Sequence, residues 1–279
     1  MKHSLSILLL SLLVAVACTN SAQPTSDVGV SAAPARIGWS EELPKLRGEV
    51  DSVRMVIEEP EHTTIYKYIY KFNQRGDVEE VLTLFSDDTP NDKWLYKYDD
   101  NGRKKELAWY RDEGPFWQTC RYKYDEQGNM VESRESTDDA MLNRIIYSYD
   151  EQGRISEMTY CDDDGNVSGR IYCKYDSEGR EIERTQCSES GEVYYTYLYK
   201  YDTYGNMIEW IGYGTDNNKS YERYNYDSYN NKVEIIADDW IGHYKYKYDS
   251  TGNVVECREY NGKENILRRV VKFKISYRQ

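Results

Sequence analysis

Residues 122–136 read YKYDEQGNMVESRES. Tyr122 and Tyr124 alternate with other residues at the period of two that marks a β-strand, and tyrosine favours strands. The spacing of Asp125 and Gly128 is typical of a type I turn whose glycine adopts a left-handed conformation and closes a bulged hairpin. The segment after Gly128 returns as a second strand. This stretch therefore predicts a β-hairpin closed by an Asp-x-x-Gly turn.

The same pattern recurs eight times. Its turns begin at residues 73, 99, 125, 150, 176, 202, 227 and 249, so the steps are 26, 26, 25, 26, 26, 25 and 22 residues. A tyrosine lies four residues before the glycine slot in seven copies, and a glutamate lies four residues after it in all eight. The residues of the glycine slot, which we expect to set each turn, are Gly76, Gly102, Gly128, Gly153, Gly179, Gly205, Asn230 and Gly252.

Each unit of about 26 residues supplies two antiparallel strands, because a second turn follows each hairpin. A leading strand (residues 48–58) and a closing strand (residues 269–277) bring the expected total to 18. The sequence therefore predicts an all-β fold, a coiled single-sheet antiparallel meander of about 18 strands built from eight hairpin repeats. We expect a spiral or an open shell, since neighbouring strands rotate by roughly 20–25° and long open sheets curl.

The bulged turn also predicts which residues face each other. The tyrosine four before the glycine slot is expected opposite the residue two after it, and the tyrosine six before is expected opposite the invariant glutamate. The lysine five before, present in six copies, is placed on the other face. We interpret the glutamates as a structural ladder that accepts hydrogen bonds from tyrosine hydroxyls or lysines, because a catalytic site is singular and this glutamate is repeated.

The N-terminal segment predicts export. Residues 1–17 carry Lys2 and then an apolar stretch that is too short to span a bilayer and fits a signal peptide. The Ala-Val-Ala sequence before Cys18 predicts a diacylated cysteine, followed by a flexible tether to residue 44 and a repeat domain over residues 45–279. We expect the outer membrane or cell surface, with membrane contact through the lipid alone; the alternative is a periplasmic or secreted protein.

Composition limits the classes of function. The net charge of −13 argues against nucleic acid as a partner. No nucleotide loop, serine elbow or zinc-protease motif occurs, and His62 and His243 lack ligand-spaced partners, so we expect no enzyme, cofactor or metal site. Residues 162–166 (DDDGN) lack the alternating spacing of a calcium loop and predict a hairpin turn.

Five cysteines follow Cys18, and the odd number argues against a complete disulfide framework. Cys161 and Cys187 occupy the same slot in neighbouring repeats, about 9–10 Å apart, which exceeds the roughly 7 Å limit for a bridge. We therefore expect small, buried strand residues.

The candidate ligand-binding residues are aromatic residues outside the repeat pattern. The turns at the edge opposite the Asp-x-x-Gly turns vary, and they carry Phe116, Trp117 and Trp240. A tryptophan at a turn tip often marks recognition. The alternative is that these loops fold over the sheet and cap it. Trp109 and Trp210 fall inside predicted strands and are interpreted as structural.

The YxYDxxGN signature resembles the YD (Rhs) repeat family, whose repeats build the β-shells of bacterial Rhs toxins and of teneurins. Residues 46–53 (LRGEVDSV) resemble the first strand of small YD-like lipoproteins. The resemblance spans about residues 45–277 and implies a shell-like fold and, as often described for the family, carbohydrate binding. We expect a non-catalytic module that binds glycan or protein. The alternatives are a passive scaffold of an envelope complex and, remotely, a glycan-active enzyme.

The sequence makes lipid attachment at Cys18 testable. Metabolic labelling with a fatty acid should tag the wild-type protein and miss the Cys18→Ser variant, because acylation requires the thiol. Equal labelling of the two proteins would contradict the anchor.

Overall fold

A computed structural model describes residues 43, 46–60, 64–111, 116–137, 140–162, 164–215, 219–238, 240–262 and 265–278. The predicted signal peptide and Cys18 lie outside these residues. The described residues form 18 β-strands, and among them no helix has the length and apolarity needed to cross a membrane. The strands are β1 (Val50–Glu59), β2 (Thr64–Phe72), β3 (Val78–Leu84), β4 (Pro90–Tyr98), β5 (Lys104–Tyr110), β6 (Phe116–Tyr124), β7 (Met130–Ser136), β8 (Met141–Tyr149), β9 (Ile155–Cys161), β10 (Val167–Tyr175), β11 (Glu181–Ser188), β12 (Val193–Tyr201), β13 (Met207–Gly214), β14 (Lys219–Tyr226), β15 (Lys232–Ala237), β16 (Ile241–Tyr248), β17 (Val254–Asn261) and β18 (Ile266–Tyr277).

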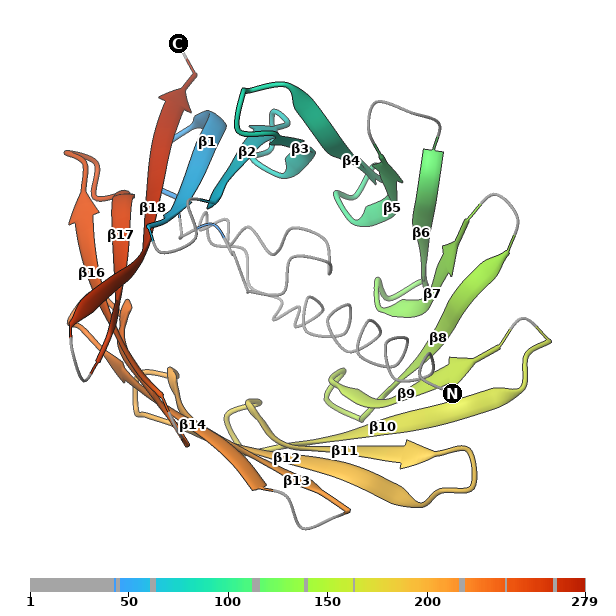
Figure 1. The fold of residues 1–279 in the computed structure, drawn as a ribbon. Helices are drawn as coiled ribbons and strands as arrows, with labels where there is room; N and C mark the ends of the chain where they lie inside the picture. Colours follow the sequence, from blue (N-terminus) through green and yellow to red (C-terminus); the bar gives the residue numbers. More distant parts are fainter. Residues whose placement is uncertain are drawn as a thin grey trace, which may run out of the picture.

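The strands follow one another round a ring in chain order (Figure 1). Each strand pairs antiparallel with the next, and β1 pairs with both β2 and β18. The all-β meander is confirmed, but the expected spiral or open shell is wrong, because the sheet closes into a barrel. Closure satisfies the backbone N–H and C=O groups that two free edge strands would otherwise expose.

Strands β1 and β18, which close the barrel, pair in the same way as the two strands of a repeat, although they come from opposite ends of the described chain. Gly48 has a φ of 83°, like the residues of the glycine slot, and Val50 lies opposite Tyr277. The N–H of Arg278 donates to the carbonyl of Glu49 at 2.9 Å, and the corresponding bond occurs in all eight continuous turns. Strands β18 and β1 are therefore the two halves of a ninth repeat.

Asn253 fastens this split repeat to the preceding one. Its side chain accepts a hydrogen bond from the N–H of Arg47 at 2.5 Å and donates to the carbonyl of Arg47 at 3.0 Å. It also donates to the hydroxyl of Tyr277 at 2.7 Å, and that hydroxyl donates to Asp249 at 2.8 Å. Asn253 itself is fully buried, so its side-chain amide depends on these partners for its hydrogen bonds.

The continuous turns have the predicted geometry. The glycines of the slot have φ between 76° and 93°, and Asn230 follows them with a φ of 62°. The opening aspartate accepts backbone N–H bonds from within its turn; Asp125, for example, accepts one from Asn129 at 2.7 Å. The N–H of Gly165 likewise donates to the carbonyl of Asp162 at 3.1 Å, and the N–H of Asp162 donates to the carbonyl of Asn166 at 2.9 Å, which confirms the hairpin interpretation.

One prediction of register is wrong. Tyr124 lies opposite Met130, as expected, but the pairing then shifts by one residue, so that Lys123 and not Tyr122 faces Glu132. The same shift occurs in all eight continuous repeats. Its physical cause is a second bulge three residues after the glycine slot, which places an extra residue in the returning strand and moves the lysine onto the face of the glutamate.

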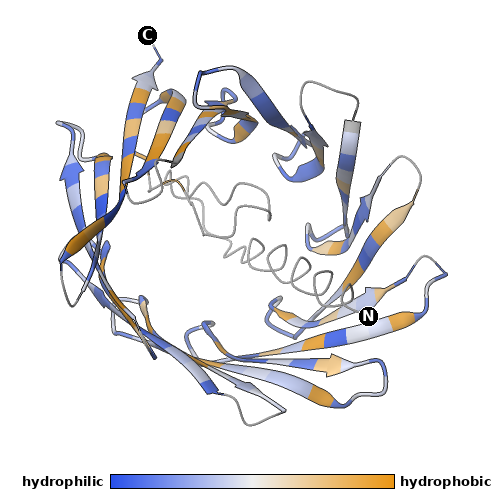
Figure 2. Cartoon of the chain, viewed as in Figure 1, coloured by the Kyte–Doolittle hydropathy of each residue, from blue (hydrophilic) through white to orange (hydrophobic). Residues whose placement is uncertain are grey.

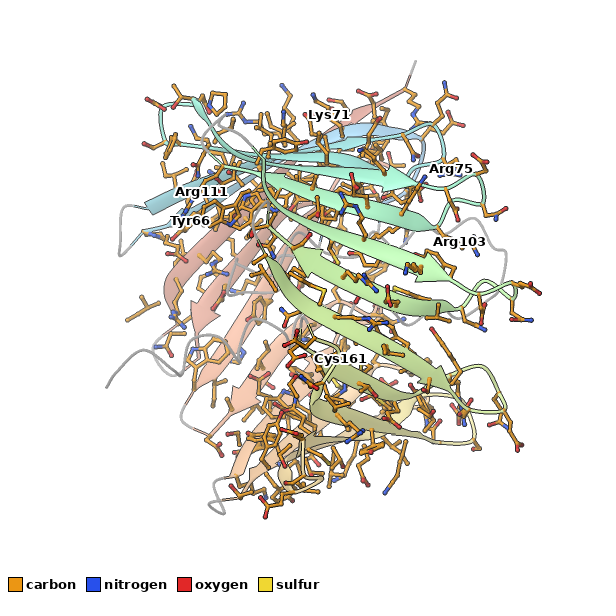
Figure 3. All side chains as sticks on the ribbon, turned by 90° about the vertical axis from the view of Figure 1, so that its right-hand side faces the viewer. Tyr66, Lys71, Arg75, Arg103, Arg111 and Cys161 are labelled. Atoms are coloured by element: carbon orange, nitrogen blue, oxygen red, sulfur yellow. The ribbon has the colours of Figure 1, made fainter. Side chains whose placement is uncertain are left out.

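The two faces of the sheet consequently differ. One carries tyrosines and aliphatic residues, with Tyr70 2% exposed and Met158 1% exposed. We assign it to the inside of the barrel, because side chains converge on a concave face and diverge on a convex one. The other face carries six Lys–Glu ion pairs at 2.5–2.9 Å and lies outward. Figure 3 shows Lys71 on the outer surface of the barrel wall. Figure 2 shows hydrophilic and hydrophobic residues alternating along the strands.

In six repeats the tyrosine four before the glycine slot ties the repeat to the one before it. Its hydroxyl donates to a backbone carbonyl of the preceding repeat, as from Tyr124 to Lys104 at 2.7 Å and from Tyr175 to Ile155 at 2.8 Å. The equivalent bonds of Tyr98, Tyr149, Tyr201 and Tyr226 are 2.6–2.7 Å long. The glutamates therefore form a ladder with lysines, as predicted, whereas these tyrosines bond to the backbone.

All five described cysteines are free. Cys161, Cys173 and Cys187 are buried, as expected, while Cys120 and Cys257 are half-buried. Burial raises the pKa of the Cys173 thiol to about 11, so it stays protonated at neutral pH.

Asn253→Ala should destabilise the barrel by about 2 kcal/mol, because it removes three hydrogen bonds that hold the split repeat. Asn129 occupies the same slot in the third repeat, but within the described residues its side chain bonds only to Asp125, at 3.0 Å. Asn129→Ala is therefore the matched control and should cost about 1 kcal/mol or less. Urea unfolding measures both values, and equal losses would contradict the fastening role.

The ladder predicts a dependence of stability on pH. Burial alone would raise the pKa of Glu132, but hydrogen bonds from Lys123, Arg134 and Arg144 lower it to about 2. A carboxylate whose pKa is lower in the folded state stabilises that state at neutral pH, and the contribution is lost as the pH falls through about 5 to about 2. Glu132→Gln should cost about 1–3 kcal/mol at neutral pH, and the difference from wild type should shrink as the medium is acidified. Thermal melts across this range test it, with the exposed Glu151→Gln as control; a difference independent of pH would contradict the mechanism.

Candidate functional site

The barrel has two unlike rims. In Figure 3 the repeat turns lie at one rim, where Arg75 and Arg103 are labelled, and the variable turns lie at the other, near Tyr66 and Arg111. The sequence predicted recognition at the variable rim, through Phe116, Trp117 and Trp240. The structure places these three residues at the start of β6 and just before β16.

Trp117 belongs to a row of three tryptophans. Its ring lies edge-on to Trp109, with centroids 5.9 Å apart, and Trp109 stacks on Trp94 at 5.9 Å with an interplanar angle of 9°. Trp94 and Trp109 are buried, whereas Trp117 is 39% exposed. The guanidinium of Arg111 lies 5.0 Å from the Trp117 ring, within the range of a cation–π contact. The row therefore leads from the core to an exposed aromatic face at the rim.

A cavity of about 210 Å³ opens beside this row. Its lining combines aromatic surface from Tyr66, Trp94 and Trp109 with the polar side chains of Asp92 and Arg111. Pockets that enclose drug-sized ligands measure roughly 300–1,000 Å³, so this cavity matches a single ring of a larger ligand. The remaining lining residues are Lys67, Tyr68, Thr83, Leu84 and Asn91.

The polar groups around the cavity are fixed by hydrogen bonds. Lys67, mostly buried, donates to the carbonyl of Ser86 at 2.6 Å and to Asp88 at 2.8 Å. The Lys67 hydrogen bond lowers the pKa of Asp88. Thr83 accepts from the N–H of Asp92 at 2.9 Å, which ties β3 to β4 beneath the opening. A ligand would therefore meet a preformed aromatic and polar surface.

Trp240 and Phe116 do not join this row. Trp240 is partly buried, its ring lies directly over Gly242, and the guanidinium of Arg268 lies 5.7 Å from the ring centroid. Trp240 thus covers its own hairpin, as in the capping alternative. The backbone of Phe116 pairs with Tyr110, but the Phe116 side chain lies outside the described structure. Trp210 is half-buried within β13, and its ring centroid lies 6.0 Å from that of Tyr197, in keeping with a structural role.

Sequence reasoning missed most of the cavity lining. Trp94 lies eight residues before its glycine slot, where the pattern suggested an ordinary strand residue, and Tyr66 is 45% exposed at the start of β2. Trp109 was interpreted as structural, and its burial agrees, but it also lines the cavity. The signal available in the sequence was that Trp94, Trp109 and Trp117 fall in one part of the chain.

The inner wall formed by β9–β11 is more polar. Arg184 is buried and donates to both carboxylate oxygens of Glu181 at 2.7 and 2.9 Å. The Gln186 amide nitrogen and the Tyr160 hydroxyl are buried with no hydrogen-bond partner among the described residues. Gly169 lies opposite Tyr160 on the strand between them and contributes no side chain. The polar lining therefore extends beyond the tryptophan row.

Other groups give less support for a site. A wider hollow of about 590 Å³ near the repeat turns includes Lys97 and Glu106, which pair with each other at 2.8 Å as in other repeats. His243 lies 3.4 Å from Glu234, and within the described ranges no group of three or more His, Cys, Asp or Glu residues is arranged to hold a metal ion.

No protein-family model and no curated protein matches the chain. Among solved structures it is similar to a porin-like protein from Bacteroides uniformis, at 12% identity over 81% of this chain and 98% of that chain, with a TM-score of 0.48. It is also similar to a chain of the TcdB2-TccC3-Cdc42 structure, at 13% identity over 76% of this chain and 14% of that chain, with a TM-score of 0.41. A LolA superfamily protein from Nitrosomonas europaea gives 10% identity over 85% of this chain and 89% of that chain, with a TM-score of 0.18. Likenesses at this level carry no argument about function.

Proposed function

We propose that this chain is an exported, lipid-anchored protein of the cell envelope, built from YD-type repeats, whose barrel is a non-catalytic module that binds a glycan at the variable rim. The observation that carries the proposal is the row of Trp94, Trp109 and Trp117 beside the cavity, with Arg111 against the exposed ring. Sugar rings stack on aromatic faces and exchange hydrogen bonds with the polar groups around them.

The outer wall supports an anchor as the membrane contact. The strands of a lipid-embedded barrel are apolar on the outside, whereas these carry paired lysines and glutamates there. A lipid on Cys18, at the outer membrane or cell surface, would leave this charged wall in water.

The repeated glutamates offer no support for catalysis. Each of Glu106, Glu132 and Glu209 is held by at least two basic side chains, which keep the carboxylate ionised and engaged. Burial raises the pKa of one half-buried glutamate, Glu259, but that residue is not part of the repeated ladder.

A passive scaffold is the second candidate. The observation that favours it is the outer ladder, which repeats with little variation and would give a partner protein the same surface at each step. A scaffold needs no exposed tryptophan, so a test of binding at the variable rim distinguishes the glycan-binding module from the passive scaffold.

A glycan array of envelope sugars, probed with the mature protein, tests the proposal. Trp117→Ala should lower affinity for a bound glycan by about tenfold, because an exposed ring contributes about 1–2 kcal/mol on truncation. The melting temperature should change little, since the ring is partly exposed. Fluorescence quenching of the wild type by the same glycan would report the contact directly.

Trp240→Ala is the control, because its ring covers its own hairpin. We expect it to lower the melting temperature and to leave glycan binding unchanged. Binding that survives Trp117→Ala, or an array without a bound glycan, would favour the scaffold.

A further inference from the structure

Two of the repeat turns carry large exposed rings. Tyr204 is 82% exposed and Tyr229 is 73% exposed, the highest values among the large apolar and aromatic residues found exposed. Both immediately precede the glycine slot, in consecutive repeats, where the other copies have Arg, Asn, Gln, Glu or Thr. Packing does not explain the two rings, because most of each lies in water.

Hydrogen bonds from the backbone hold the turns that carry these two rings. The N–H of Tyr204 donates to Asp202 at 2.8 Å, and the N–H of Tyr229 donates to Asp227 at 2.9 Å. These bonds fix the turn beneath each ring.

The turns are also fastened to one another. The amide of Asn206 donates to Asn230 at 3.2 Å, which joins the first turn to the second. The amide of Asn231 donates to the hydroxyl of Tyr248 at 2.6 Å, and the Tyr229 and Tyr248 ring centroids are 5.9 Å apart. The two turns, and with them the backbones of Tyr204 and Tyr229, therefore stand about two strand separations apart, roughly 9.6 Å.

The turns themselves are polar and carry little charge, although Arg180 of the preceding turn donates to the carbonyl of Asp202 at 3.1 Å. The turns at 202–206 (DTYGN), 227–231 (DSYNN) and 249–253 (DSTGN) carry no charge beyond the opening aspartate, which each turn uses for its own backbone. Each of the five earlier turns has a further charged residue. The three turns also lack Val, Leu, Ile, Met and Phe, so the rings are not part of the continuous apolar centre that a protein interface requires.

We propose that Tyr204 and Tyr229 form a platform for an extended, uncharged β-1,4-linked glycan strand. In such a strand alternate sugar rings present the same face at a repeat close to the spacing of the two turns, so one ring stacks on each tyrosine. The asparagine amides between them meet the sugar hydroxyls. This platform lies at the rim opposite the tryptophan row and does not depend on the proposed function of that row.

The test measures binding of chitohexaose and cellohexaose by calorimetry. Both β-1,4 hexaoses should bind the wild type, and the α-1,4 hexaose maltohexaose, which curves, should not. Tyr204→Ala and Tyr229→Ala should each weaken binding by about tenfold, with no change in melting temperature. Tyr172→Ala, a 40% exposed tyrosine of β10, is the matched control and should bind as the wild type does.

Trp117→Ala separates this site from the variable rim, because a platform at the repeat turns should not respond to it. Failure of both β-1,4 hexaoses to bind would overturn the proposal. Equal binding of maltohexaose, or wild-type affinity in both tyrosine variants, would overturn it as well.

Discussion

The barrel depends on the pairing of β1 with β18. A single sheet has no second layer against which to bury a face, and an open one would leave two edge strands unpaired. Closure removes both edges and turns the tyrosine face into an interior. The pairing is specific because β1 and β18 together reproduce the left-handed glycine and the bulge of the other repeats, and the tyrosine that seven of them carry. The buried Asn253 then holds both halves against the repeat before them.

Much of this fold is legible in the sequence, because each hairpin is specified locally. The Asp-x-x-Gly turn, the strand alternation and the left-handed Asn230 follow from single-residue preferences, and all were predicted correctly. The second bulge was not, because no turn residue marks it; the extra residue is Val131 in one copy and Lys105 in another. Closure was missed for a different reason. In the sequence, Gly48 and Tyr277 are only the first residue of the leading strand and the last residue of the closing strand, and nothing in either segment shows that the two pair with each other.

The candidate sites likewise contain residues that the sequence predicted and residues that it did not. Trp117 was predicted from its place in a variable turn, and it is the exposed member of the tryptophan row. Trp94 could not be assigned to that row, since it is the pairing of β4, β5 and β6 that brings the rings together. Tyr204 and Tyr229 were not predicted, although they differ from the Arg, Asn, Gln, Glu or Thr that the other copies carry at the same position. In a repeat protein, a residue that differs from its counterparts in the other copies is more informative about a binding site than the residues that all copies share.

The split repeat restricts how such a chain can change during evolution. Antiparallel closure requires an even number of strands, because with an odd number the first and last strands would run parallel and their bonding pattern would not match. Duplication of a whole repeat adds two strands and keeps β1 and β18 complementary, so it yields a wider ring of the same kind. Loss or gain of a single strand would break the seam. The barrel can therefore grow or shrink only by whole repeats, so that its diameter changes in discrete steps. A genetic duplication or deletion that keeps the barrel closed must comprise a whole number of repeats.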